Sequence, residues 1–330
     1  MKPDACYNGK GDGSRKQAEI WQCELERQGY QVDLINPWGN YQWNSYDIVH
    51  FYGIGLWDYD MIRWGSGLNR NIVFSPIIDS NTPLWKYRLF SHLGCERLRL
   101  FSQNYAVRCY KDNVKLFLAR TQYEASYLSQ YGISQDKIGL VPLSYREDRY
   151  NPNVQKEPFC LFAGTMTQER KNVPRLIEAA KKYEFRLVLA GSLGNSESES
   201  RLRSLIGDAQ NIEVKGFVSD EELYSLYNRA RVFALPSLNE GVGLVALEAA
   251  VHGCNIVITK LGGPKEYYRD GTVWLVDPYS VDDIGKNIKM ALQVEHLQPE
   301  LRNEIVQKYN VSHCVQLLLK QYEEVCKMRI

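Results

Sequence analysis

The eight cysteines of this 330-residue chain lack the close pairing that metal and redox sites need. No two of them are spaced as C-x-x-C, which argues against a zinc ribbon and against a redox dithiol. We therefore expect reduced thiols in a cytoplasmic compartment. The cysteines stand at Cys6, Cys23, Cys95, Cys109, Cys160, Cys254, Cys314 and Cys326.

Long apolar runs and a strong net charge are also lacking. No run of eighteen apolar residues and no signal-peptide core occurs, so we expect a cytoplasmic chain without a membrane-spanning helix. The formal net charge is only +1, which removes any bulk electrostatic argument for a nucleic-acid partner. A length of 330 residues with 44% hydrophobic content suits two domains, each with its own core.

Strand-like apolar runs alternate with helical patterns along the chain, which predicts a mostly parallel α/β sheet. The polar segment 145–157 lies between Pro142 and Pro158 and resembles a linker, so we place the domain boundary near residue 153. In the first half the expected strands cover residues 31–35, 47–51, 71–74, 115–119 and 138–141.

The most informative segment is residues 236–250, a glycine turn between an apolar run and a helix. The run 232–235 fits a buried parallel strand, and the pattern from Val242 onward predicts a helix. Gly241 and Gly243 let backbone N–H groups approach an anion closely, and a helix N-terminus adds about half a positive charge. A pyrophosphate group suits such a turn.

Two carboxylates flank this turn. Glu240 borders the expected anion site, and Glu248 lies nearly two turns into the helix. A carboxylate in contact with phosphate would repel it, so Glu248 suits neutral hydroxyls such as a ribose diol. The alternative is an ordinary helix glutamate beside a glycine turn.

The second half of the chain resembles the donor-binding domain of retaining GT-B glycosyltransferases of the GT4 family, whose E-x7-E signature corresponds to Glu240 and Glu248. The resemblance covers about residues 158–280 and is weaker in the first half. Its other motifs lie at residues 159–173, 187–191, 214–218, 262–266 and 274–278.

This resemblance implies an α/β GT-B fold with two Rossmann-like, doubly wound parallel-sheet domains facing a cleft. Residues 1–152 would form the acceptor-side domain, and residues 153–311 would bind the nucleotide-sugar donor. The last helix, about residues 312–330, would cross back onto the first domain.

The resemblance also implies the donor contacts. Glu240 would contact sugar hydroxyls and Glu248 the ribose, while the strand ending at Gly164 leads toward the phosphates. The backbone of the turn at residues 216–218 would contact the base, and the backbone of the glycine turn would contact the diphosphate. The residues for the base are Gly216, Phe217 and Val218, and those for the diphosphate are Gly241, Val242, Gly243 and Leu244.

Lys171 precedes a helix, so its ammonium could neutralise the departing diphosphate. The family usually carries an arginine directly after the strand glycine, where this chain has Thr165. Arg170 either compensates from another angle or is a solvated neighbour.

The first half departs from the family pattern at a histidine that many members carry after the strand at residues 72–75. Asp79 could take over that contact with the sugar or the acceptor. His50 ends a strand-like run and suits a packed, hydrogen-bonded residue better than a catalytic one.

The N-terminal turn contains Gly11 and Gly13 and precedes a helical pattern at residues 16–28. It either faces the donor phosphates and the acceptor, as the resemblance implies, or is simple loop chemistry. The expected first strand, residues 1–6, is short, so either the start lies upstream or the strand is degenerate.

Double displacement would need two carboxyl groups about 5 to 5.5 Å apart. Eight residues of helix span about 12 Å, so Glu240 and Glu248 do not suit that role. The resemblance leaves front-face substitution, in which the departing diphosphate helps to deprotonate the incoming hydroxyl. No acidic cluster suggests a metal site, so we expect neither metal nor cofactor.

The favoured function is transfer of a sugar from a nucleotide-diphosphate donor to a saccharide or lipid-linked acceptor, for cell-surface polysaccharide or glycolipid assembly. The alternatives are a nucleotide-sugar epimerase and a non-catalytic nucleotide-sugar-binding protein. A dehydrogenase fits less well, because no strand-G-x-G-x-x-G-helix unit is present.

A basic, aromatic-rich segment in the first half suggests peripheral contact with anionic lipid at the inner face of a membrane, with a solvated helix face as the alternative. Its basic residues are Lys86, Arg88, Arg97, Arg99, Arg108, Lys111 and Lys115, against Glu96 and Asp112.

Overall fold

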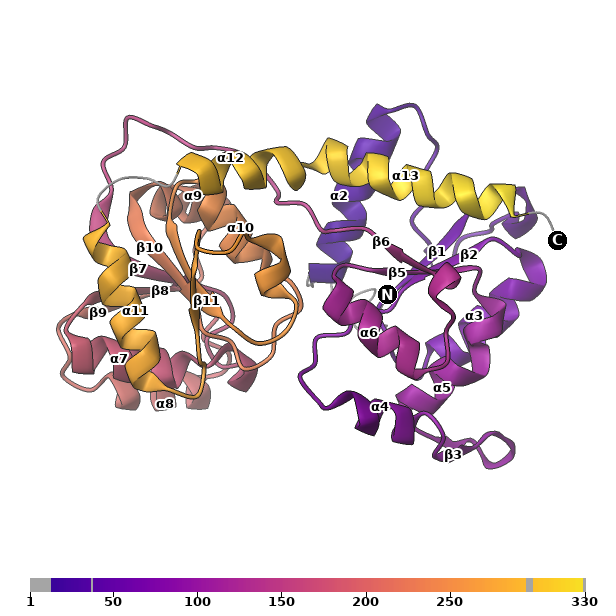
Figure 1. Ribbon diagram of the computed structural model, residues 1–330, viewed down its shortest axis with the longest axis horizontal. Coiled ribbons are helices and arrows are strands. Elements are labelled where there is room, and N and C mark those ends of the chain that lie inside the picture. Colours follow the sequence, from indigo (N-terminus) through magenta and orange to yellow (C-terminus); the bar gives the residue numbers. More distant parts are fainter. Residues whose placement is uncertain (1–12, 37, 295–298, 329–330) are drawn as a thin grey trace. The chain divides into compact units, whose positions relative to one another are not determined.

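The computed structural model describes residues 13–36, 38–294 and 299–328 (Figure 1). The chain divides into two compact units. Unit 1 comprises residues 1–144 and 311–330, and unit 2 comprises residues 145–310. The boundary between Ser144 and Tyr145 precedes residue 153, where the linker composition had led us to place it.

Unit 1 is built on a four-stranded parallel sheet with the order β1-β2-β5-β6. Its strands are β1 (Val49–Tyr52), β2 (Ile72–Ser75), β5 (Leu116–Ala119) and β6 (Ile138–Leu140). All residues of β2 and β5 are buried, as expected for short apolar strands covered on both faces. Four expected strands are therefore confirmed.

Residues 31–35 form no strand, contrary to our expectation. Leu34 and Ile35 are 40% and 41% exposed, so these side chains do not enter the core. Side chains bind the backbone here instead: Gln22 donates to the Val32 carbonyl, and the Tyr41 hydroxyl donates to the Leu34 carbonyl. Local side-chain hydrogen bonds of this kind compete with strand pairing.

The helices of unit 1 are α2 (Gly13–Arg27), α3 (Asp58–Leu68), α4 (Leu84–Phe90), α5 (Gln103–Tyr110), α6 (Gln122–Gln130) and α13 (Val311–Lys327). A short antiparallel hairpin joins β3 (Gly94–Cys95) to β4 (Leu100–Phe101). The core packs Phe74 edge-on against Tyr110 and Phe117.

His50 joins the sheet of unit 1 to the C-terminal helix. Its ring nitrogens contact the Tyr322 hydroxyl of α13 at 2.7 Å and the Ser75 hydroxyl of β2 at 2.8 Å. Burial lowers the pKa of His50 to about 3, because the charged ring would lose its hydration. Both ring nitrogens are thus hydrogen-bonded within the fold, as the sequence suggested.

Unit 2 has a six-stranded parallel sheet with the order β12-β11-β10-β7-β8-β9. The chain builds outward from β7 through β8 to β9, then returns to the other side of β7 with β10. The point at which the strand order reverses lies between β7 and β10. In sequence order the strands are β7 (Glu157–Ala163), β8 (Arg186–Ala190), β9 (Ile212–Gly216), β10 (Ala230–Leu235), β11 (Asn255–Thr259) and β12 (Trp274–Val276).

Polar side chains begin several helices of unit 2. The Ser219 hydroxyl accepts the Glu222 N–H at 3.1 Å at the start of α9, and Asn195 caps α8 in the same way. The helices are α7 (Val173–Tyr183), α8 (Ser196–Ile206), α9 (Asp220–Arg229), α10 (Leu244–Val251), α11 (Val281–Gln293) and α12 (Pro299–Lys308). Among the helices so described, none is long and apolar enough to cross a membrane.

The half-buried imidazole of His50 makes the stability of unit 1 depend on pH. The pKa of His50 is about 3 in the folded state and about 6.5 in the unfolded state. The neutral ring therefore contributes fully to the free energy of unfolding above pH 6.5, and this contribution is lost as the pH falls toward 3. Between pH 7 and pH 5 the loss should be about 2 kcal/mol. Denaturant titrations at both pH values should show a loss about 2 kcal/mol larger for the wild type than for His50→Gln, because other groups, such as Asp58 with its pKa raised by burial to about 6, titrate in both proteins. An equal loss in both proteins would contradict the assignment.

Candidate functional site

The predicted donor-site residues of unit 2 gather at the carboxyl ends of its strands. Lys171 ends the short helical turn Glu169–Lys171 that follows β7, and Glu240 lies in the loop that follows β10. These are the two strands between which the strand order reverses. Open parallel sheets bind ligands at this edge and at this reversal.

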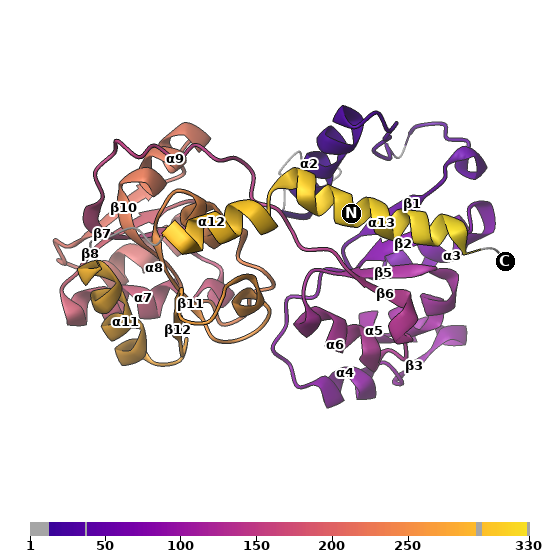
Figure 2. The same ribbon diagram turned by 45° about the horizontal axis from the view of Figure 1, so that its top comes forward.

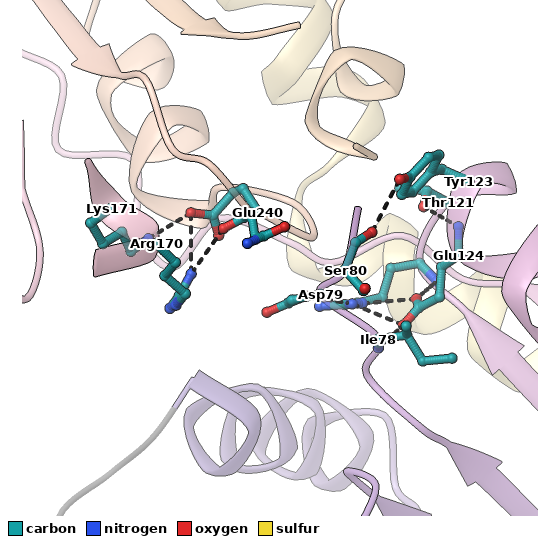
Figure 3. A network of polar contacts seen from close by, with 11 residues as sticks. Ile78, Asp79, Ser80, Thr121, Tyr123, Glu124, Arg170, Lys171 and Glu240 are labelled. Atoms are coloured by element: carbon teal, nitrogen blue, oxygen red, sulfur yellow. Dashed lines mark hydrogen bonds and ion pairs between the residues drawn. The ribbon is translucent and has the colours of Figure 1, made fainter. Parts of the chain in front are cut away.

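Lys171 and Glu240 form a buried ion pair across this edge (Figure 3). The Lys171 ammonium donates to Glu240 Oε2 at 2.6 Å, and the Ser237 hydroxyl donates to the same oxygen at 3.2 Å. Both residues of the pair are 8% exposed. Arg170 Nη1 lies 3.5 Å from Oε2 at the exposed side of the pair. Glu240 Oε1 has no partner among the described residues.

Asn172 fastens the loops that carry this pair. Its side-chain amide donates to the Pro236 carbonyl at 2.9 Å and to the Pro278 carbonyl at 2.6 Å. The Leu238 N–H donates to the Arg170 carbonyl at 2.7 Å. The loops after β7, β10 and β12 are thus bound together. The sequence pattern gives no sign of this role for Asn172, because its partners are distant backbone carbonyls.

Gly164 lies where the ends of β7 and β8 come together. Its N–H donates to the Ala190 carbonyl at 3.0 Å, and a Cβ on neighbouring Gly191 would lie 2.0 Å from the Gly164 carbonyl oxygen. Lys171 Cε lies 4.0 Å from the position of a Cβ on Gly164. That separation is an ordinary van der Waals contact, so the requirement for glycine at residue 164 comes from its φ of 148°, which residues with a side chain rarely adopt.

The glycine turn opens α10 at Leu244, not at Val242 as predicted. Gly243 takes a left-handed conformation with φ 77°, which ends the helix in the N-terminal direction. A Cβ on Gly243 would lie 3.1 Å from Leu235 Cδ2. Among the described residues, no acceptor forms a hydrogen bond with the backbone N–H groups of Gly241, Val242, Gly243 and Leu244. Backbone N–H groups at the start of a helix are suited to binding an anion.

Glu248 lies on α10 and is 2% exposed. The guanidinium fork of Arg146 holds both of its oxygens, with Nε 2.5 Å from Oε1 and Nη2 3.0 Å from Oε2. Tyr227 donates a longer bond of 3.4 Å to Oε2. The Arg146 Nη1 reaches Asp220 at 3.0 Å. Sequence reasoning placed neutral hydroxyls on Glu248 and missed Arg146, although a glutamate within an apolar helix needs a counter-charge.

The predicted base-contacting turn follows β9. The Gly216 carbonyl accepts the Gly191 N–H at 2.7 Å, which fixes the turn to the end of β8. Phe217 is 88% exposed, an unusual environment for a large aromatic ring. Val218 is partly buried beside it.

Asp79 lies in unit 1, in the loop that follows β2. Arg120 Nη2 donates to Asp79 Oδ1 and to Glu124 Oε1, both at 2.8 Å (Figure 3). Glu124 also accepts the Ile78 N–H at 2.5 Å, and Ile77 takes a left-handed φ of 58° that strains a β-branched residue. The local sequence around Asp79 gives no sign of Arg120 or Glu124.

Two further predictions concern the N-terminal turn and metal ions. Gly13 is the first residue of α2, and Gly11 lies outside the described residues. Within the ranges that the structure describes, no group of three or more His, Cys, Asp or Glu side chains could hold a metal ion.

The pairing of Arg146 with Glu248 predicts a large effect of removing one charge. Arg146→Leu leaves a buried carboxylate without its cation, so the free energy of unfolding should fall by about 3–5 kcal/mol. Replacing both residues with leucine should recover most of that loss. Arg201→Leu breaks the exposed pair of Arg201 with Glu197 and should change stability by less than about 1 kcal/mol. Chemical denaturation measures all three, and an Arg146→Leu effect as small as that of the control would contradict the assignment.

Comparisons with known proteins agree with this geometry. The model of the family described as Glycosyl transferases group 1 matches residues 145–310. The D-inositol 3-phosphate glycosyltransferase of Pseudarthrobacter chlorophenolicus is 30% identical over 195 residues, which cover 52% of this chain and 46% of that protein. The O-antigen chain mannosyltransferase B of Escherichia coli is 29% identical over 202 residues, covering 55% and 52%. The chain thus spans about half the length of these curated relatives.

Solved structures resemble the chain over most of its length. Sucrose-phosphate synthase from Thermosynechococcus elongatus matches with a TM-score of 0.68 and 18% identity, covering 85% of this chain and 74% of that one. Anabaena HepE, solved in complex with UDP and glucose, matches with a TM-score of 0.66 and 17% identity, covering 84% and 78%. These likenesses confirm the predicted GT-B fold. With the family match over unit 2, they identify the chain as a member of the glycosyl transferases group 1 family.

Proposed function

We propose that this chain transfers a glycosyl group from a nucleoside-diphosphate sugar to a hydroxyl of a saccharide or lipid-linked saccharide, with retention of configuration. One observation carries the proposal: the buried Lys171–Glu240 pair lies at the strand-order reversal beside backbone N–H groups that have no acceptor among the described residues. A transferable sugar and an anionic leaving group need this combination of a carboxylate, a cation and an anion site.

In this proposal the N–H groups of the glycine turn bind the diphosphate and Lys171 neutralises it. An ammonium group has three donors, so Lys171 can keep its bond to Glu240 while it donates to a phosphate oxygen. Arg170 lies 3.5 Å from Glu240 Oε2 and supplies a second cation near the same charge. As the bond to the sugar breaks, the growing negative charge on the phosphate meets donors that are already in place.

Glu240 acts in this proposal as a hydroxyl acceptor and not as a nucleophile. Lys171 and Ser237 hold its Oε2, which leaves Oε1 for a sugar hydroxyl. Front-face substitution then breaks the bond from the anomeric carbon to the phosphate oxygen and forms the bond to the acceptor oxygen on the same face. The acceptor's proton passes to the departing diphosphate, and the products are a glycosylated acceptor and a nucleoside diphosphate.

At the nucleoside end, Glu248 is proposed to bind the ribose hydroxyls, and the Gly216–Val218 turn to contact the base. Arg146 holds the Glu248 carboxylate in one orientation, since its fork spans both oxygens. The exposed ring of Phe217 offers a flat apolar surface beside the turn. Asp79, which Arg120 fixes at the carboxyl edge of the unit 1 sheet, is proposed to bind the acceptor or the sugar.

We also propose a role in cell-surface polysaccharide or glycolipid assembly, with peripheral contact at the inner face of a membrane. A relative named O-antigen chain mannosyltransferase supports a polysaccharide role. A second candidate is nucleotide-sugar binding without turnover, which Thr165 favours because it stands where the family usually has an arginine.

A nucleotide panel tests the donor site. We expect one of UDP, GDP and ADP, but neither CMP nor NAD, to raise the melting temperature by several degrees, since ligand at a hundred times its dissociation constant stabilises by about 2.7 kcal/mol. Glu248→Ala should lose this shift, measured against its own ligand-free melting temperature. Glu197→Ala, which changes an exposed glutamate, should keep it. No shift with any diphosphate would contradict the proposal.

Turnover tests the role of Lys171. Charge-assisted hydrogen bonds contribute about 1.5 to 3 kcal/mol, so Lys171→Ala should lower the rate of nucleoside diphosphate release about tenfold or more. Lys182→Ala, an exposed lysine on α7, is the matched control. A wild-type rate in Lys171→Ala would refute the assignment.

We also propose that transfer needs no metal ion, because Lys171 and the glycine turn supply the positive charge. EDTA should therefore leave the rate unchanged. A rate that falls with EDTA and returns with Mg²⁺ would refute metal independence.

A further inference from the structure

Residues 84–100 of unit 1 form an exposed apolar surface, which we name the α4–hairpin surface. Helix α4 has no buried residue, and every residue from His92 to Leu100 is exposed. The surfaces of soluble monomeric proteins seldom group so many large hydrophobic side chains, and patches of this kind mark interaction sites. The group comprises Leu84 (37% exposed), Trp85 (62%), Leu89 (47%), Phe90 (42%), Leu93 (53%), Leu98 (65%) and Leu100 (67%).

This surface is held in place by packing beneath it. Tyr87, the one aromatic residue of α4 directed inward, lies 4.6 Å from Tyr127 and 6.0 Å from Tyr131, measured between ring centroids. Ser91 is fully buried, and its hydroxyl donates to the Arg88 carbonyl at 2.7 Å. Leu84 and Leu89 therefore belong to an anchored helix, and the contacts of Glu96 with Tyr59 and Arg63 of α3 hold the hairpin. In both views, α4 and β3 lie on the side of unit 1 away from α13 (Figures 1 and 2).

The charges on this surface are mostly of one sign. Lys86, Arg88, Arg97 and Arg99 stand against the single acidic residue Glu96. Glu96 is already neutralised, because Arg63 of α3 pairs with it. No described carboxylate forms an ion pair with Lys86, Arg88 or Arg97, and Arg99 reaches Asp60 only at 3.8 Å.

Basic and apolar side chains alternate at short range here. Lys86 Nζ lies 5.6 Å from the centre of the Trp85 ring on α4. In the hairpin, Leu98 and Leu100 flank Arg99, which adopts a left-handed φ of 52°. An interfacial element needs this mixture, with apolar groups to enter the acyl boundary and cations to meet phosphate headgroups.

We propose that the α4–hairpin surface docks on an anionic phospholipid bilayer, with Trp85, Leu98 and Leu100 inserted at the headgroup boundary. A second copy of this chain fits poorly, because a symmetric contact would bring the same unpaired cations together. Nucleic acid would use the cations but not the leucines. This surface would make the membrane contact that the proposed function includes. Only its link to a lipid-linked acceptor rests on the proposed function.

Vesicle flotation tests the surface without any donor or acceptor. The full chain should float with phosphatidylcholine vesicles that contain about a third phosphatidylglycerol at low salt. It should bind pure phosphatidylcholine at least tenfold more weakly. Arg88→Gln with Arg97→Gln should weaken binding to anionic vesicles about tenfold or more, since each cation near the surface contributes on that scale. Leu98→Ser with Leu100→Ser should weaken it at least tenfold as well.

Matched controls come from the same unit. Leu56 is 61% exposed and Arg70 is exposed, and neither lies on the α4–hairpin surface. Leu56→Ser with Arg70→Gln should bind vesicles as the wild type does. Phospholipid brominated in the acyl chain should quench wild-type tryptophan fluorescence more than that of Trp85→Phe.

The outcomes separate this inference from the proposed function. Absence of wild-type flotation with anionic vesicles would overturn the inference, and so would unchanged flotation of either α4–hairpin variant. Each of these variants should keep the wild-type thermal shift with the nucleoside diphosphate, because the donor site lies in unit 2. Loss of flotation with a retained thermal shift supports the inference, whereas wild-type flotation without any thermal shift would refute only the donor site.

Discussion

The site of unit 2 depends on the buried ion pair of Lys171 with Glu240. The pair joins the loops after β7 and β10, the strands at which the sheet reverses its order. Burying either charge alone would be costly, so each residue requires the other to be present. Asn172 secures the same loops through backbone carbonyls. The glycine turn follows Glu240 directly, and its N–H groups form no hydrogen bond with an acceptor among the described residues.

The second glutamate follows the same physical rule with a different partner. Glu248 lies in the apolar helix α10, and Arg146 compensates its charge from the segment that leads into β7. The two carboxylates therefore have separate cations and separate surroundings. This separation fits the two proposed roles, Glu240 at the sugar and Glu248 at the ribose, better than it fits a catalytic pair of carboxylates.

The sequence predicts some of this arrangement well, for identifiable reasons. Continuous apolar runs such as residues 232–235 indicate strands that are buried on both faces, and the structure confirms β10 there. Residues 31–35 include the polar residues Gln31 and Asp33, and their backbone carbonyls accept hydrogen bonds from side chains instead of pairing with a strand. The start of α10 shifts to Leu244 because Gly243 adopts a left-handed φ. Arg146 could not be predicted, since nothing local to a polar segment reveals a partner on a distant helix, although Glu248 itself signals that a cation is needed.

A crystal structure of the chain with its preferred nucleoside diphosphate would test the central claim most directly. The account predicts Lys171 Nζ within about 3 Å of a phosphate oxygen, N–H groups of the Gly241–Leu244 turn donating to the same diphosphate, and ribose hydroxyls on Glu248. A nucleotide bound away from the β7 and β10 loops, with the Lys171–Glu240 pair untouched, would contradict it.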